Sequence, residues 1–329
     1  MSKRLCSFFI TLIALVGGCG PNIKPGEHPM AQSAIFRNNA PPNTLAVIPT
    51  QASQLSAYTG VDNTLTTYPT TKIHPEKSAS GRPRYALVIG NSDYTDLGTL
   101  PNPRNDASAV AVRLRQAGFT LLRPVRTNQD VQSDLGLEEM HKADVALKQA
   151  SSGAEIVMLF YAGHGLQLDG LPYLVPTDLT QVDVQSLATP TGRKAIESRL
   201  FKLDDFIEGL DQQAELAVAV FDACREIPAF TTRSLFAGSM NYRGLAHPQT
   251  QGKHRILAFS AGFGELAVDG KGEHSPYTQA FLDEFDQGTK LTIMDFFLRV
   301  NARVAGVTKQ TPEFLVEGSV PMDAYLISP

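Results

Sequence analysis

The chain has 329 residues, of which 43% are hydrophobic and 19% are charged, and its formal net charge is −4. This is ordinary globular composition with enough apolar surface for a real core, in one large domain or two modest ones. The small negative charge and the absence of a basic stripe with interleaved aromatics argue against a nucleic-acid partner. Scattered histidines and the lack of Cys-x-x-Cys argue against a structural metal site.

The N-terminus has the pattern of an export signal. Lys3 and Arg4 precede an apolar run over 5–16, which is too short to span a bilayer. The run ends in Val-Gly-Gly-Cys19, which resembles a bacterial lipobox, with an ordinary cleaved signal peptide or an amphipathic leader as the alternative. The resemblance implies a signal peptide over 1–19 and a lipid anchor on Cys19. Because Gly rather than Asp follows Cys19, it also implies a bacterial envelope protein at the outer membrane, facing the periplasm.

Two further regions follow the leader. Residues 20–80 are rich in Pro, Asn, Thr, Ser and Gln and lack apolar periodicity, so we predict a flexible tether. From residue 81 to 329 the pattern is that of a folded domain.

The sequence predicts the following strands and helices in the domain. Continuous apolar runs predict buried strands at 85–89, 156–161, 216–221 and 256–260, and shorter strands are expected at 120–125 and 313–316. Helical spacing predicts helices after an N-cap at Asn105 up to Gly118, and over 131–151, 203–210, 277–285 and 292–305. Alternating strands and helices indicate an α/β fold with a mostly parallel six-stranded sheet sandwiched between helices.

Two chemistry-bearing residues follow two of these strands. His164 lies between two glycines just after the 156–161 strand, and Cys224 comes just after the 216–221 strand. In open parallel sheets, binding and catalytic residues lie beyond the carboxyl ends of the strands. A nearby imidazole favours the thiolate of a cysteine and makes it a nucleophile. Taken alone, Cys224 would be interpreted as a small buried apolar residue and His164 as a backbone-bonded loop histidine, but together at matching strand ends they favour the functional interpretation.

The blocks Phe-Tyr-Ala-Gly-His164-Gly165 and Phe-Asp222-Ala-Cys224-Arg resemble the His and Cys blocks of caspase-type peptidases, closest to bacterial metacaspase-like domains. The His and Cys lie 60 positions apart, against about 50 in caspases. Segments at 84–90, 100–107 and 274–278 resemble further blocks of that group, so the resemblance spans roughly 82–327.

The resemblance implies a cysteine endopeptidase acting on proteins or peptides. Cys224 would attack the scissile carbonyl, His164 would protonate the leaving amine, and the N–H groups of Gly165 and Cys224 would form the oxyanion hole. Asp106 and Asp222 would line the pocket that selects Arg or Lys before the cut, as two half-buried carboxylates favour a cation. Their structural alternatives are an acidic residue at a helix N-terminus for Asp106 and a loop cap for Asp222.

Some residues depart from the family pattern. Position 162 is Ala where many metacaspases have Ser, and Glu226 stands where caspases have Gly. The alternative is therefore a catalytically idle caspase-like domain that binds a protein partner.

No cofactor is expected, since the aspartate-rich calcium segment of calcium-activated metacaspases is not evident. Asp178 and Asp183 are the only nearby candidates, and calcium activation stays open. A basic stretch at 189–199, expected as a loop, suggests a site of self-cleavage, with a solvated basic loop as the alternative.

Overall fold

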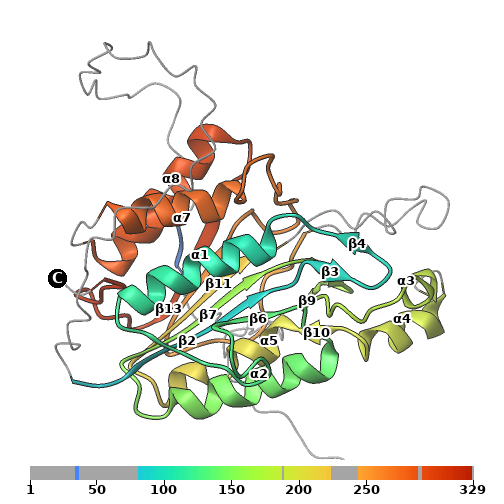
Figure 1. Ribbon diagram of the computed structural model, residues 1–329, viewed down its shortest axis with the longest axis horizontal. Coiled ribbons are helices and arrows are strands. Elements are labelled where there is room, and N and C mark those ends of the chain that lie inside the picture. The colour runs from blue at the N-terminus through green and yellow to red at the C-terminus, as the bar shows by residue number, and fades with distance from the viewer. Residues whose placement is uncertain (1–33, 37–80, 187–188, 224–243, 288–290, 328–329) are drawn as a thin grey trace, which may run out of the picture. The chain divides into compact units, whose positions relative to one another are not determined.

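The computed structural model describes residues 34–36, 81–186, 189–223, 244–287 and 291–327. Its central sheet has the strand order β1-β13-β12-β11-β7-β2-β5, and β6 also pairs with β2. The strands from β12 through β11, β7 and β2 to β5 and β6 run parallel, whereas β13 is antiparallel to β12 and β1 is antiparallel to β13. The fold is therefore α/β with a mainly parallel sheet, as expected (Figure 1).

The sheet strands are β1 (Ala34–Phe36), β2 (Arg84–Gly90), β5 (Thr120–Leu121), β6 (Val131–Ser133), β7 (Ile156–Ala162), β11 (Leu216–Asp222), β12 (His254–Phe259) and β13 (Glu313–Gly318). The α-helices of the described residues are α1 (Pro103–Gln116), α2 (Leu137–Ser151), α3 (Gln181–Ser186), α4 (Pro190–Glu197), α5 (Leu203–Ile207), α7 (Pro276–Asp286) and α8 (Ile293–Val307). A small sheet joins β8 (Gly165–Leu168), β9 (Leu171–Leu174) and β10 (Phe201–Lys202), and β3 (Asp93–Tyr94) pairs with β4 (Gly98–Thr99).

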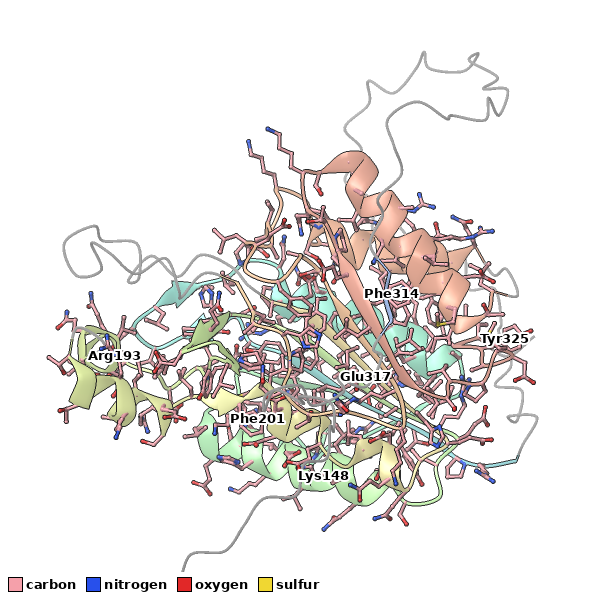
Figure 2. The ribbon with its side chains drawn as sticks, turned by 180° about the vertical axis from the view of Figure 1, so that it is seen from behind. Lys148, Arg193, Phe201, Phe314, Glu317 and Tyr325 are labelled. Carbon is pink, nitrogen blue, oxygen red and sulfur yellow. The ribbon has the colours of Figure 1, made fainter. Side chains whose placement is uncertain are left out.

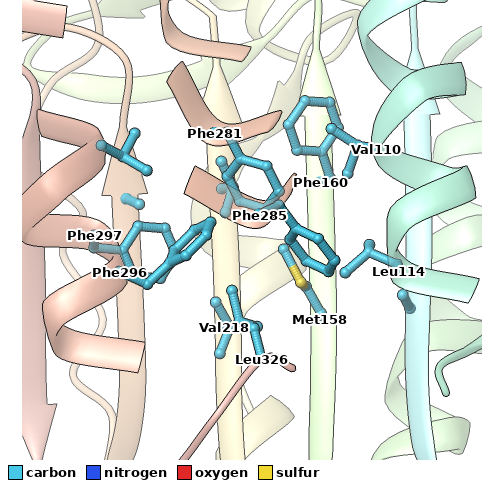
Figure 3. Packing of buried hydrophobic residues seen from close by; sticks show 14 of the residues in the cluster. Val110, Leu114, Met158, Phe160, Val218, Phe281, Phe285, Phe296, Phe297 and Leu326 are labelled. Carbon is cyan, nitrogen blue, oxygen red and sulfur yellow. The ribbon is translucent and has the colours of Figure 1, made fainter. Parts of the chain in front are cut away.

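Helices cover both faces of the central sheet. Figure 1 shows α1, α7 and α8 over one face and α2 and α5 over the other. Alternate residues of each strand enter the two cores, so Met158 and Phe160 join the core under α1, α7 and α8, whereas Leu159 and Tyr161 join the core under α2 and α5. Figure 3 shows the first core, where Phe160 packs near Phe281 and the other aromatic side chains of α7 and α8. Strands buried on both faces explain the continuous apolar runs in the sequence.

Within the described residues the sheet has eight strands rather than the six expected. The predicted 120–125 strand is limited to β5, and the chain returns to β2 as β6 within a segment that helical spacing had assigned to a helix. That helix begins only at Leu137, since residues 131–133 are taken by pairing with β2, a tertiary contact that local periodicity does not reveal. The eighth strand, β1, falls in the range expected as a tether.

Two other local predictions were wrong. Helix α1 begins at Pro103 rather than after an N-cap at Asn105, since proline has no N–H to lose and is suited to the first helical position. The basic stretch expected as a loop forms α4, whose N-cap Thr189 accepts a hydrogen bond from the Gly192 N–H. Figure 2 shows Arg193 on this helix, away from the central sheet. A helix is not the extended form in which a peptidase binds a chain, so the structure does not favour self-cleavage at this stretch.

One ion pair is fully buried in the sheet. Arg255 of β12 and Glu317 of β13 are register partners, 1% and 5% exposed, and Arg255 Nε donates to Glu317 Oε2 over 2.8 Å. The guanidinium also donates to the carbonyls of Ile207 and Thr250, so each of its three nitrogens has an acceptor (Figure 2 labels Glu317). The pair ties the antiparallel edge of the sheet to the loop before β12.

We expect Glu317→Ala to lower the free energy of unfolding by about 3–5 kcal/mol, because it leaves the Arg255 charge buried without its partner. The measurement is urea denaturation followed by circular dichroism. The matched control is Glu215→Ala, which breaks the exposed pair with Arg82 and should cost about 1 kcal/mol or less. Equal losses in the two variants would contradict a special role for the buried pair.

Candidate active site

The carboxyl ends of β7, β11 and β2 meet at one edge of the sheet. Ala162, the last residue of β7, is the register partner of both Asp222 on β11 and Gly90 on β2. His164 therefore follows its strand end by two residues, and position 224 follows the neighbouring strand end by two residues. Neighbouring strands lie about 4.8 Å apart, so Ala162 and Asp222 end their strands side by side.

The backbone of His164 is held by two tyrosine hydroxyls. Its N–H donates to Tyr94 Oη over 2.7 Å, and its carbonyl accepts from Tyr161 Oη over 2.9 Å. The Tyr94 ring lies 4.6 Å from the imidazole, centroid to centroid, and His164 is 1% exposed. A buried backbone group without a partner costs about 1–3 kcal/mol, so these two hydroxyls stabilise the turn that aims the imidazole.

Gly163 is required by this arrangement. A Cβ at position 163 would lie 2.7 Å from Tyr94 Oη and 2.8 Å from Tyr161 Oη, and the residue has φ of +157°. Any side chain would push the two hydroxyls away from His164. The glycine therefore permits the close approach that the tyrosines need.

Asp134, which directly follows β6, holds the backbone just before Tyr94. Asp134, with φ of 52°, accepts hydrogen bonds from the N–H groups of Ser92 and Asp93, each over 2.9 Å, and pairs with Arg104. Burial alone would raise the pKa of Asp134, but the hydrogen bonds from the Asp93 N–H, Arg104 and the Ser92 N–H together lower it below its usual value. Asp134 thus fixes the backbone immediately before Tyr94.

Asp106 and Asp222 converge on the beginning of α7. Asp106 Oδ1 accepts from His274 Nδ1 over 2.9 Å and from the Ser275 N–H over 3.2 Å. Asp222 Oδ2 accepts from Ser275 Oγ and, over 2.8 Å, from Thr278 Oγ1. Both carboxylates are 0% exposed. The two acidic residues that sequence reasoning assigned to one pocket therefore do share a neighbourhood, and Ser275, the N-cap of α7, donates a hydrogen bond to each of them.

Strand alternation explains why Asp222 faces α7. Val220 of β11 belongs to the core under α1, α7 and α8, and Asp222 follows it by two positions on the same face. Tyr277 is fully buried in that core, and its pKa is raised by burial and further by the negative charge of Asp222. Asp106 reaches the same place from α1, which sits close on β2 because Gly90 has no side chain: a Cβ there would lie 2.6 Å from the Pro103 carbonyl.

The other predicted site residues are placed as follows. Gly165 is buried and begins β8, where its register partner is Leu174. Cys224 and Glu226 lie outside the described residues, as does Cys19. The roles of Gly165 and Cys224 in an oxyanion hole therefore stay predictions.

The two candidates for calcium do not form a cluster. Asp178 accepts from the N–H of Leu137, and Asp183 accepts from the N–H and hydroxyl of Thr180. Within the described residues, no group of three or more His, Cys, Asp or Glu side chains could hold a metal ion. Likewise, none of the helices in this part of the chain is long and apolar enough to cross a membrane.

Sequence reasoning missed the residues that hold the predicted ones. Tyr161 lies in the apolar strand β7 and Tyr94 in the short strand β3, and nothing in the local pattern of either indicates that its hydroxyl contacts His164. The sequence points to the segment at 274–278 only through the family resemblance, which gives this segment no role. Its contacts with Asp106 and Asp222 join residues 169 and 53 positions apart, beyond the range of any periodicity.

The fold and the edge of the sheet define a caspase-type α/β domain. The family model described as the caspase domain matches residues 83–319, which is most of the chain. The chain therefore belongs to the caspase-domain family and is, in general class, a cysteine peptidase acting on proteins or peptides. No curated protein gives a significant match to it.

Tyr94→Phe should lower kcat/KM for peptide cleavage about tenfold or more, because the buried His164 N–H loses its acceptor and the turn shifts. The measurement is steady-state cleavage of a peptide that the wild type cuts. Tyr173→Phe is the matched control: it removes a hydroxyl that contacts Glu197 Oε1 over 3.0 Å and does not contact His164. A similar loss in both variants would show that the effect is general destabilisation rather than placement of His164.

Proposed function

We propose that this chain is a cysteine endopeptidase of the caspase and metacaspase type that cleaves after Arg or Lys through a Cys224–His164 dyad. The observation that carries the proposal is the register of β7 against β11. It sets Ala162 opposite Asp222, in a chain of the caspase-domain family, and His164 and Cys224 each come two positions later in the sequence.

The chemistry follows from the residue types. The imidazole of His164 accepts the thiol proton, and the thiolate of Cys224 attacks the carbonyl carbon of the scissile bond. Backbone N–H groups of Gly165 and Cys224 stabilise the negative oxygen, an effect usually worth a few kcal/mol of barrier. His164 then gives its proton to the leaving amine, and water hydrolyses the thioester to release the acid product and the free thiol.

Selection of a basic side chain rests on Asp106 and Asp222. Both carboxylates are fully buried and each accepts a hydrogen bond from Ser275, which supports a shared negative pocket. A guanidinium or ammonium group supplies the donors and the positive charge that such a pocket favours, whereas an acidic side chain would be repelled.

The test is cleavage of fluorogenic peptides with Arg, Lys or Asp before the scissile bond, by the full chain in reductant, with and without calcium. We expect cleavage after Arg and Lys only, lost in Cys224→Ala. Asp106→Asn should lower kcat/KM for the basic peptides about tenfold or more, by removing one charge from the pocket.

The matched control is Asp286→Asn, which alters an exposed carboxylate at the far end of α7, paired with Arg113 of α1. It should leave cleavage unchanged. If folded protein cleaves none of these peptides in a thiol-dependent way, the endopeptidase proposal fails and the idle binding domain takes its place.

We further propose that Cys19 carries a lipid that anchors the protein in a bacterial envelope membrane, on the outer-membrane side facing the periplasm. The lipobox-like Val-Gly-Gly-Cys at 16–19 supports this. Two or more acyl chains provide stable anchoring, whereas one chain binds a membrane only marginally.

Expression in a Gram-negative bacterium with a clickable fatty acid is expected to label the wild type and place it in the outer-membrane fraction. Cys19→Ala should be unlabelled, and Cys6→Ala, a cysteine in the leader, should behave as wild type. Equal labelling of wild type and Cys19→Ala would contradict the anchor.

A further inference from the structure

Ser275 joins two carboxylates that come from distant parts of the chain. Its N–H donates to both oxygens of Asp106, over 3.2 and 3.4 Å, and its hydroxyl donates to Asp222 Oδ2. Thr278 adds a second donor to the same oxygen of Asp222, over 2.8 Å. All four residues are 0% exposed. Helix α1, strand β11 and helix α7 therefore meet at one serine.

The need to cap a helix does not by itself explain this serine. As N-cap of α7, Ser275 Oγ accepts from the Thr278 N–H over 2.9 Å, and Asp or Asn would cap a helix equally well. At the N-cap of α8, Thr292 Oγ1 instead donates within its own helix, to Asp295 Oδ2 over 2.8 Å. The Ser275 hydroxyl instead donates its hydrogen bond outside its helix, to Asp222 on β11. An aspartate at position 275 could not donate this bond and would repel Asp222.

These donors allow the two carboxylates to keep their charges. A buried carboxylate is strongly disfavoured as an ion unless hydrogen-bond donors replace the lost water. Ser275, Thr278 and His274 provide such donors, and the positive end of the α7 dipole points in the same direction. Without these donors the two carboxylates would either take up a proton or turn toward other hydrogen-bond partners.

We propose that Ser275 and Thr278 are positioning residues for substrate specificity: they hold Asp106 and Asp222 charged and aimed at the basic side chain of the substrate. This inference rests on the proposed function and adds to it the residues that set its selectivity. This role concerns the carboxylates rather than the dyad, so the chemical step should be less affected than binding of the basic side chain.

The experiment compares the full-chain wild type with Ser275→Ala, Thr278→Val and the conservative Ser275→Thr. Thr278→Val keeps the α7 cap, which uses only the Thr278 N–H, and removes a single donor to Asp222. The matched control is Thr292→Val, which removes the cap hydroxyl of α8 without contacting either carboxylate. Circular dichroism and thermal denaturation establish that each variant is folded.

Three readouts are taken. KM and kcat are measured for an Arg peptide, binding of Nα-acetyl-arginine amide is measured by calorimetry, and the rate of alkylation of Cys224 by iodoacetamide reports on the dyad. For Ser275→Ala and Thr278→Val we expect KM and the dissociation constant of the arginine amide to rise about tenfold or more, since each variant loses a hydrogen bond to a charged group. The change in kcat should be smaller, alkylation should be unchanged, and Ser275→Thr should restore binding.

The outcomes separate the two proposals. If the wild type binds and cleaves basic ligands but both variants match Thr292→Val, or if kcat and alkylation fall while KM stays constant, the positioning role is overturned. If the wild type neither cleaves the Arg peptide nor binds the arginine amide, the proposed specificity fails, and the role of Ser275 and Thr278 fails with it.

Discussion

Seven consecutive residue pairs join β7 to β11 in parallel, from Ile156 opposite Leu216 to Ala162 opposite Asp222. This register decides what lies at the carboxyl edge of the sheet, because parallel strands end at the same edge and a slip of one residue would turn every side chain to the other face. Both strands are buried on both faces, and apart from Asp222 at the end of β11 their side chains are apolar or aromatic, so the two cores hold the register in place.

The same alternation divides the support of the site between the two faces. Tyr161 points into the core under α2 and α5, where its hydroxyl reaches the His164 carbonyl, while Asp222 points toward α7. The roles proposed for His164 and for the two aspartates have different requirements: the first needs a fixed backbone turn, and the second needs hydrogen-bond donors around buried carboxylates. Because the two sets of contacts lie on opposite faces of the sheet, separate helices and loops provide them and do not occupy the same space.

Most strands and helices of the fold are predictable from the local sequence pattern. Strands such as 156–161 were predicted because a two-sided burial leaves an unbroken apolar run, and α7 and α8 because their apolar spacing is helical. The errors fall where a tertiary contact overrides the local preference. Residues 131–133 pair with β2 despite helical spacing, and the basic stretch after Thr189 is helical because its cap and Pro190 begin a helix that its charges do not suggest.

The sequence by itself determined the class of fold, the family and the placement of His164, Asp106 and Asp222 near strand ends or a helix start, because apolar periodicity and short motifs are local properties. Only the tertiary structure decided which residues hold them. The hydroxyls of Tyr94 and Tyr161 on His164, and Ser275 between Asp106 and Asp222, are contacts across as many as 169 positions. Such contacts depend on the register and packing of whole elements, and no short stretch of sequence records them.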